Sequence, residues 1–473
     1  MQFIVGTSVS RLETESAVSD GADATADLYG LRPPVVRAVL AAIGAEDVKR
    51  VRLLVHPLHY SDHADLIEQL DHDERRFVVD AIRDDFNPKI LSELDETVRG
   101  EIVNWLGVTH VASAVSELRS DNAVKVIKDL DESLQRQVLD AITATARENV
   151  EQSLAYPDES AGRLMRRELF AVQASWTIGQ TIDHIREAAD LPDDIFDVYV
   201  VDAGGKPIGS SPPHKLLGAR RSARITSIMR TNLETIPAST DQEDVAMVFR
   251  DHDLISAPVV DDKGRLLGVI TVDDVVDVID KEAEEDLLRM AGLSRDDLYR
   301  AALATARSRF SWLAVNLLTA ILASVVIAFF EGTIDQIVAL AVLMPIVASM
   351  GGNAGTQTMT VAVRALAMRE LGPENSLRFV GKELLVGLIN GVLFSIVTGV
   401  VAGLWFASAG LGIVIAAAMV FNLIVAGLSG TLIPLALQRG GVDPAIASTV
   451  LLTTVTDVVG FLAVLGLGAL FLT

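Results

Sequence analysis

The sequence contains no cysteine, and this absence limits its chemistry at the outset. A chain of 473 residues without a thiol can form no disulfide, no thiolate zinc site and no cysteine nucleophile. All eight histidines lie before residue 253, so the C-terminal part offers no Ser–His pair and no HExxH motif. Basic residues are also scarce, with 40 Lys and Arg against 63 Asp and Glu. This acidic excess argues against nucleic acid as a partner, because phosphate binding requires a basic face.

The charged and the apolar residues lie in different parts of the chain. The net charge is −23, although 50% of the residues are hydrophobic. Residues 310–473 hold 5 basic and 7 acidic residues, whereas residues 1–309 hold 35 basic and 56 acidic residues. This distribution predicts an acidic part outside the membrane, joined to a nearly neutral membrane part. Residues 1–30 are rich in Ser, Thr, Asp and Ala, and we expect them to form a loose N-terminal segment.

Five apolar runs in residues 310–473 predict a transmembrane domain with five helices, since about 20 apolar residues span a bilayer. The expected spans cover roughly residues 312–331, 336–362, 380–406, 412–437 and 446–471. Lys and Arg lie before span one, between spans two and three, and between spans four and five, but not in the other two loops. This alternation predicts a cell (inner) membrane protein with the N-terminal half in the cytoplasm and the C-terminus outside. Residues 1–30 lack the apolar core of a signal peptide.

One acidic residue, Asp457, lies in the middle of the last apolar run, within Thr453-Thr454-Val455-Thr456-Asp457-Val458-Val459-Gly460. A carboxylate at this depth is costly and normally faces water or a partner. The middle of the spans contains no Lys or Arg that could pair with it. Three interpretations stay open: a protonated packing residue, a cation ligand and a proton relay. The threonine oxygens nearby suit a cation, because hard cations prefer oxygen ligands.

The second span contains residues that disturb a helix. Pro345 is followed by the segment Ser349–Gln357, which holds three glycines and Asn353. These residues predict a broken or distorted helix whose backbone carbonyls line an ion path, with close helix packing through the glycines as the alternative. Asn353, Asn422 in span four and Glu383 at the inner mouth of span three are candidate pore-lining residues.

These membrane motifs resemble the MgtE family of magnesium channels and transporters. The resemblance rests on the glycine segment of span two, on Gly381-Lys382-Glu383 and on Asp457-Val458-Val459-Gly460. It implies a homodimer with five helices per subunit, in which an aspartate of the last helix binds hydrated Mg²⁺; by motif that residue is Asp457. Where the family often has Gly-Asn-Gln, this chain has Gly355-Thr356-Gln357.

Residues 31–150 contain a repeated helical pattern. Leucines at positions 70, 94, 118 and 130 each precede a polar helix start and an apolar stripe that closes twelve residues later. Short helical repeats of this kind stack into a superhelical array. The N-terminal domain of the MgtE family is such an array, so the resemblance implies the same fold.

Residues 157–280 change to a β-α pattern that occurs twice. Val198–Asp202 and Ala257–Asp261 are strand-like, and each is followed by a glycine turn and an apolar pair with glycine, Ile208-Gly209 or Leu267-Gly268. Two such units about sixty residues apart resemble a tandem pair of CBS domains, with an α/β fold.

The second of these units carries a complete ligand pattern. Its segment Gly268–Asp274 matches the Gly-x-x-Thr-x-x-Asp pattern that holds an adenosine ribose in CBS domains. Thr271 and Asp274 are therefore candidate nucleotide ligands, with ATP as the possible cofactor. The corresponding segment of the first unit, Gly209–Lys215, departs from the pattern, so a purely structural pairing module is the alternative.

The segment after the second CBS unit is strongly acidic, since eight of the fourteen residues from Asp273 to Asp286 are Asp or Glu. Such a helix either presents a solvated face or forms surfaces that repel one another until Mg²⁺ bridges them. By resemblance, the candidate regulatory Mg²⁺ ligands are Asp253, Asp274, Asp277, Glu282, Glu285 and Asp286. Residues 281–309 are expected to form a connecting helix, similar to the plug helix of the family.

Together these observations predict a multi-domain membrane protein with a superhelical repeat domain, a tandem CBS pair, a connecting helix and a five-helix transmembrane domain. The expected function is that of a Mg²⁺-selective channel, not an enzyme. It would work as a homodimer in membrane lipid and close when cytoplasmic Mg²⁺ binds the acidic surfaces. Mg²⁺ selectivity would come from binding a largely hydrated ion, because Mg²⁺ loses its waters reluctantly.

Three alternatives belong to other classes of protein. A channel or carrier for Co²⁺ or Mn²⁺ would use the same ligand types. A membrane-tethered nucleotide sensor would need only the CBS pair. An intramembrane aspartyl hydrolase needs two carboxylates, and one chain supplies a single one in mid-membrane.

Overall fold

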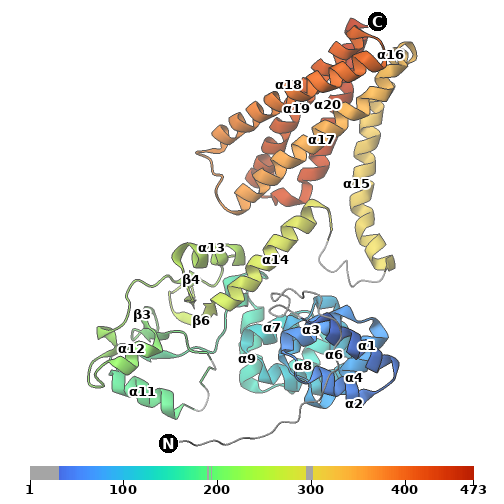
Figure 1. Ribbon diagram of the computed structural model, residues 1–473. Coiled ribbons are helices and arrows are strands. Elements are labelled where there is room, and N and C mark those ends of the chain that lie inside the picture. The colour runs from blue at the N-terminus through green and yellow to red at the C-terminus, as the bar shows by residue number, and fades with distance from the viewer. Residues whose placement is uncertain (1–30, 189–190, 193, 294–301) are drawn as a thin grey trace, which may run out of the picture. The chain divides into compact units, whose positions relative to one another are not determined.

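The computed structural model describes residues 31–188, 191–192, 194–293 and 302–473. The chain forms two compact units, Met1–Gln152 and Ser153–Thr473 (Figure 1). The predicted loose segment 1–30 lies outside the described residues.

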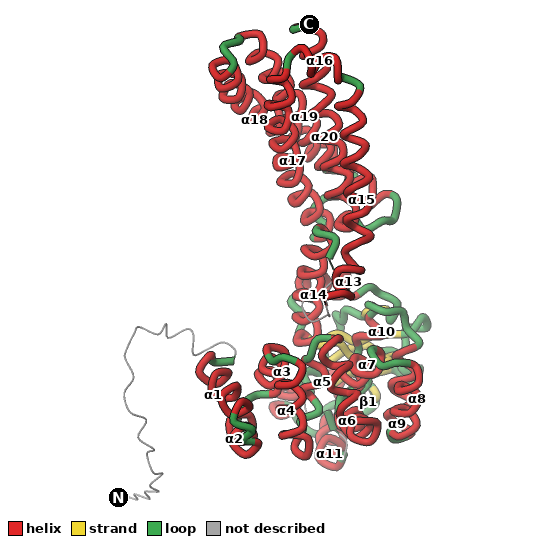
Figure 2. Tube along the Cα trace, turned by 90° about the vertical axis from the view of Figure 1, so that its right-hand side faces the viewer, coloured by secondary structure: helices red, strands yellow, loops and turns green. Residues whose placement is uncertain are grey.

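The first unit is built from short helices (Figure 2). These are α1 (Pro33–Gly44), α2 (Val48–Val55), α3 (Tyr60–Gln69), α4 (His72–Ile82), α5 (Lys89–Glu93), α6 (Glu96–Glu117), α7 (Ser120–Lys128), α8 (Glu132–Ala141) and α9 (Ala144–Leu154), with a 3₁₀ turn at Arg83–Asp85. Four of them, α4, α6, α7 and α8, begin two residues after the repeated leucines at 70, 94, 118 and 130. The twelve-residue pattern therefore marked helix starts, as expected of a helical repeat.

The repeat also places buried arginines that its leucine pattern did not reveal. Arg75 and Arg99 each lie five residues after a repeat leucine and are 7% and 4% exposed. Arg75 donates to the carbonyl of Leu70 at 3.1 Å, and Arg99 donates to the carbonyl of Leu94. These guanidinium groups satisfy carbonyls at helix ends, which otherwise lack partners.

The second unit begins with two small three-stranded sheets. The first contains β1 (Ala171–Gln173), β2 (Val198–Val201) and β3 (Pro207–Ser211), and the second contains β4 (Ile236–Pro237), β5 (Ser256–Val260) and β6 (Leu266–Thr271). In each sheet the first two strands are parallel and the last two are antiparallel. The accompanying helices are α10 (Ala161–Leu164), α11 (Ile178–Glu187), α12 (Pro213–Gly218) and α13 (Gln242–His252), with a 3₁₀ turn at Ile225–Ser227. The α/β repeat predicted from the two strand–glycine patterns is confirmed.

The two CBS units exchange short segments. Met165 lies before the first sheet but packs in the core of the second, where its sulfur would be 2.7 Å from a Cβ on Gly268. Met229 lies before the second sheet but packs against the core of the first, where its sulfur would be 2.8 Å from a Cβ on Gly209. Each glycine is required because a Cβ would also lie 2.5 Å from the backbone oxygen of Arg166 at Gly268 and 2.6 Å from that of Arg230 at Gly209, and a backbone oxygen cannot move aside as a methionine side chain can.

The second unit continues into α14 (Val272–Met290), α15 (Ala302–Ala328), α16 (Glu331–Gln336), α17 (Val338–Ala367), α18 (Ser376–Trp405), α19 (Ala409–Arg439) and α20 (Pro444–Phe471). Among the described residues five helices, α15 and α17 to α20, are long and apolar enough to cross a membrane. In this bundle α19 packs against α17, α18 and α20, and α15 packs against α20 (Figure 1). The predicted five-helix architecture is confirmed.

Two local predictions were wrong. Helix α17 continues through Pro345 and all three glycines to Ala367, because neighbouring helices can cover the freed backbone groups of a proline in a membrane helix. The connecting helix expected at 281–309 is also not one helix. Helix α14 starts earlier, at Val272, and ends at Met290, before Gly292 with φ of 68°. The next described helix is α15, and residues 294–301 lie outside the described residues.

Candidate functional site

Asp457 lies on α20 in the middle of the helix bundle and is partly buried. Within the described part of the chain, no cation and no hydrogen-bond donor contacts its carboxylate. The hydroxyl of Thr456 next to it donates to the carbonyl of Leu452 at 3.0 Å, and that of Thr453 donates to Thr449 at 3.0 Å. These bonds use the hydroxyl protons within α20. Thr456 is fully buried, so of these two it is the partly buried Thr453 whose oxygen lone pairs remain able to accept or to bind a cation.

The glycines of α17 allow α19 and α20 to approach closely. A Cβ on Gly351 would lie 2.2 Å from Nδ2 of Asn422 on α19, and one on Gly355 would lie 2.8 Å from Leu452 on α20. Gly352 has more room, because the nearest atom is the hydroxyl of Thr456 at 3.9 Å. The structure therefore shows the packing role that was the alternative to a broken helix.

The three pore-lining candidates occupy different environments. Asn353 is exposed on α17, where no other described helix of the chain covers it. Asn422 is fully buried, and its Nδ2 donates to the carbonyl of Val347 at 2.8 Å. Because its side chain reaches no surface, Asn422 does not fit the prediction of a pore-lining residue and serves to join α19 to α17.

Glu383 is buried on α18, with 7% of its surface exposed. It accepts a hydrogen bond from Thr358 of α17 at 3.1 Å and pairs with Lys382 at 3.3 Å. Its backbone carbonyl would lie 2.9 Å from a Cβ on Gly427 of α19. Glu383 thus connects three helices, and its carboxylate is already partnered.

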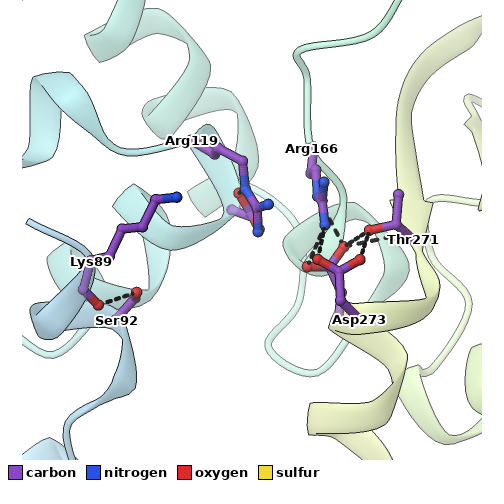
Figure 3. Close-up of polar contacts among 8 residues, drawn as sticks. Lys89, Ser92, Arg119, Arg166, Thr271 and Asp273 are labelled. Carbon is purple, nitrogen blue, oxygen red and sulfur yellow. Dashed lines mark hydrogen bonds and ion pairs between the residues drawn. The ribbon is translucent and has the colours of Figure 1, made fainter. Parts of the chain in front are cut away.

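The ribose pattern of the second CBS unit is occupied by an arginine of the same chain. Arg166 Nε donates to Asp274 Oδ2 at 3.1 Å and its Nη2 donates to Asp274 Oδ1 at 3.2 Å. The hydroxyl of Thr271 also donates to Asp274, at 2.8 Å. Figure 3 shows Arg166 beside Thr271 and Asp273. Arg166 also donates a hydrogen bond to the carboxylate of Asp273. Burial raises the pKa of Asp273, but the bond from Thr271 and the charge of Arg166 hold that pKa below its usual value.

This arrangement bears on both roles predicted for Asp274. The carboxylate is 9% exposed and accepts a bidentate pair from Arg166, so a ribose or a metal ion must displace the guanidinium to reach it. Arg166 itself is 5% exposed. The sequence did not indicate this partner, because the two residues lie 108 positions apart.

The remaining candidate Mg²⁺ ligands do not form one site. Asp253 and Asp277 are exposed, on the end of α13 and on α14. Glu282 lies beside Gln242 and Glu243 of α13, and burial together with the charge of Glu282 raises the pKa of Glu243 to about 7. In the described ranges no group of three or more acidic or histidine side chains is placed to hold a metal ion. A regulatory site built from these residues therefore needs a further surface.

Glu285 and Asp286 lie at the end of α14, where it meets the start of α20. Arg289 pairs with Glu285 one turn away and donates to Asp443 Oδ2 at 2.6 Å. Burial raises the pKa of Asp286, and the carboxylates of Asp443 and Glu282 raise it further. We call the contacts of Arg289 with Asp443 and of Met290 with Thr449, together with the pair of Glu285 and Arg289, the α14–α20 junction.

Comparison with protein families gave three matches. Residues 344–467 match the model of MgtE divalent cation transporters, residues 58–159 match the MgtE intracellular N domain, and residues 225–281 match the CBS domain.

Three curated relatives share the name magnesium transporter MgtE. The protein of Thermus thermophilus is 35% identical over 71% of this chain and 75% of its own length. That of Enterococcus faecalis is 33% identical over 68% of this chain and 71% of its own length. That of Bacillus subtilis is 28% identical over 90% of this chain and 94% of its own length.

Proposed function

Because the chain belongs to the MgtE family of divalent cation transporters, we propose that it conducts Mg²⁺ through a membrane pore and closes when cytoplasmic Mg²⁺ accumulates. It is a multi-pass membrane protein with an intracellular N-terminal domain. The proposal is supported above all by the carboxylate of Asp457, which lies on a membrane-crossing helix. Among the described residues, no Lys, Arg or His pairs with this carboxylate. The names of the relatives support Mg²⁺ as the cargo.

Asp457 would supply the charge of the pore site, one carboxylate per subunit, with threonine oxygens of α20 around it. A carboxylate that touches the waters of a hydrated Mg²⁺ suits an ion that keeps several waters when bound. The Co²⁺ and Mn²⁺ alternatives use the same ligands, and competing divalent ions in the flux assay below distinguish them.

The test is Mg²⁺ uptake into proteoliposomes that contain the full chain. We expect Asp457→Ala to abolish uptake while the protein still inserts. Asp335→Ala is the matched control, because Asp335 is an exposed carboxylate of the same domain on α16. Normal uptake by the Asp457 variant would refute the pore assignment.

For regulation, we propose that the acidic residues of α14 bind Mg²⁺ together with a further surface, from the N-terminal domain or a second subunit. Neutralising Asp277, Glu282, Glu285 and Asp286 together should leave flux running at high internal Mg²⁺. Asp274 belongs to the set predicted from the sequence, but its salt bridge with Arg166 is almost fully buried, so its neutralisation disturbs the fold more than that of Glu285, whose salt bridge with Arg289 is partly exposed. Unchanged closure in the fourfold variant would contradict the acidic sensor.

The proposed assembly is a homodimer with the C-terminus outside the cell. The absence of cysteine gives a direct test, since single cysteines can be introduced without background labelling. A cysteine at Thr473 should react with an impermeant maleimide from outside, and one at Arg439 should react from inside. Mass photometry of the full chain in nanodiscs should give the mass of the empty disc plus two chains, and an excess of one chain would contradict the dimer.

We also propose that the second CBS unit binds an adenine nucleotide such as ATP through Thr271 and Asp274. The Gly-x-x-Thr-x-x-Asp pattern supports this second role. The bidentate pair with Arg166 implies that binding requires Arg166 to move, and calorimetric titration of the full chain with ATP tests it.

A further inference from the structure

The α14–α20 junction joins a cytoplasmic helix directly to the helix that carries Asp457. Asp443 is the N-cap of α20: its Oδ1 accepts from the backbone N–H of Ala445 at 2.8 Å, and its Oδ2 accepts from Arg289 at 2.6 Å. The carboxylate of Asp443 therefore caps the N-terminus of α20 and also binds Arg289 of α14. Since α20 is continuous from Pro444 to Phe471, a shift of its first turn reaches Asp457, about 20 Å along the helix.

Two further contacts make this junction specific. The hydroxyl of Thr449 donates to the carbonyl of Met290 at 2.8 Å, which satisfies one of the carbonyls that a helix end leaves without a partner. The side chain of Met290 packs against a cluster that contains Met359 of α17 and Ala445 and Leu452 of α20. The last turn of α14 thus contacts α20 through a salt bridge, a hydrogen bond and an apolar contact.

The acidic side chains at this junction explain why a positive charge is needed there. Docking of α14 places Glu285 and Asp286 near Asp443, where burial raises the pKa of Asp286 and the negative charges of Asp443, Glu282 and Glu285 raise it further. Arg289 pairs with both Glu285 and Asp443, so its single positive charge offsets part of that repulsion. The side chain of Arg289 is 36% exposed, so water and dissolved ions can reach its ion pair with Asp443.

We infer that Arg289 is a positioning residue for channel closure: its guanidinium is a tethered cation that holds α14 on the start of α20 without a bound metal ion. This inference rests on the proposed Mg²⁺-gated function. If closure requires the docked arrangement, Arg289 supplies part of the positive charge that Mg²⁺ must otherwise provide. The channel then closes at a lower internal Mg²⁺ concentration than its acidic surfaces alone would allow.

A double-mutant cycle in the full chain tests this inference. Proteoliposome flux at varied internal Mg²⁺ gives the half-closing concentration of the wild type, Arg289→Gln, Asp443→Asn and the double variant. Asn at position 443 keeps an N-cap acceptor but removes the charge. We expect Arg289→Gln to raise the half-closing concentration roughly three- to fivefold, the effect of a partly exposed ion pair, and to add little in the Asp443→Asn background.

Two controls separate the ion pair from a general effect. Arg289→Lys keeps the charge and should shift the half-closing concentration less than Arg289→Gln. Arg265→Gln removes an arginine that is also partly exposed, at 55%, and that pairs with Asp261 in the hairpin of the second CBS unit, and it should cause no shift. Equal shifts from Arg289→Gln with and without Asp443→Asn, or no shift at all, would overturn the inference.

A second measurement does not depend on transport. Hydrogen exchange in Mg²⁺-free buffer should be faster at residues 445–450 in Arg289→Gln than in the wild type, because the first turn of α20 loses its attachment. If the wild type shows no Mg²⁺-gated flux but exchange responds, the proposed function fails while the tether stands. If the wild type is gated by Mg²⁺ but Arg289→Gln changes neither the exchange rate nor the half-closing concentration, the inference about Arg289 is wrong and the proposed function stands.

Discussion

Two adjacent glycines of α17 differ in their surroundings, and this difference gives a quantitative prediction. A methyl group on Gly351 would lie 2.2 Å from Nδ2 and 2.9 Å from Cγ of Asn422, whereas one on Gly352 would meet nothing closer than Thr456 at 3.9 Å. Contacts under 3.0 Å force a neighbour to move. Asn422 is fully buried and bonded to Val347, so it cannot move without loss of that bond.

The magnitude follows from a comparison of Gly351→Ala with Gly352→Ala. Both substitutions gain about 1 kcal/mol of helix propensity, and this gain cancels in the difference. Overpacking at Gly351 costs about 1–3 kcal/mol, and loss of the hydrogen bond between Asn422 and Val347 costs about 0.6 kcal/mol more. We therefore expect Gly351→Ala to be less stable than Gly352→Ala by about 2 kcal/mol, about a thirtyfold change in the folding equilibrium.

Reversible unfolding by SDS in mixed micelles measures this difference on the full chain. The double variant Gly351→Ala with Asn422→Ala provides the decisive control, because removal of the amide makes room for the new methyl group. Its destabilisation should be smaller than the sum of the two single effects by about 1 kcal/mol, as is usual for residues in contact. Equal stability of the two alanine variants, or strict additivity in the double variant, would refute the packing explanation.

Three further predictions concern the cytoplasmic part. Arg166→Gln should increase ATP affinity about tenfold or more in calorimetry of the full chain, because it frees Asp274 from a bidentate ion pair; unchanged affinity would show that Arg166 does not block the ribose position. Glu243, whose pKa is raised to about 7, binds a proton more tightly in the folded protein, so its contribution to stability falls as pH rises from about 4.5 to about 7. The same proton competes with Mg²⁺, and the half-closing Mg²⁺ concentration should rise as pH falls from 8 to 6 in the wild type but change less in Glu243→Gln. Arg99→Met should leave buried carbonyls unpaired and destabilise the helical repeat by about 3 kcal/mol, seen as faster hydrogen exchange over residues 89–130, while Arg76→Met on the exposed face of α4 should not.

Local patterns of the sequence predicted much of this fold. The leucines at 70, 94, 118 and 130 predicted helix starts because, in a helical repeat, each helix begins at the same position after its leucine. The strand–glycine patterns predicted the CBS sheets because Gly209 and Gly268 lie where a neighbouring segment packs against the strand and leaves no room for a side chain. The apolar runs identified the membrane helices because length and hydropathy alone are sufficient for that assignment.

Properties that depend on contacts distant in the sequence could not be predicted in the same way. Pro345 and the glycines predicted a broken helix, but α19 and α20 approach closely and α17 stays continuous. Asn422 was identified as a polar residue of a span, yet only the structure shows that its Nδ2 donates to the carbonyl of Val347 on α17. The partner of Asp274 is equally non-local, because Arg166 precedes the first sheet.

The exchange of Met165 and Met229 between the two CBS units affects where the chain can be divided. A fragment that starts at residue 225, as the matched CBS family model does, would leave Gly268 facing an empty space and carry Met229 away from its own sheet. The smallest piece that keeps both cores whole begins near Ser160 and includes both sheets. The pair is therefore expected to melt in a single cooperative transition, and neither half is an independently transferable module.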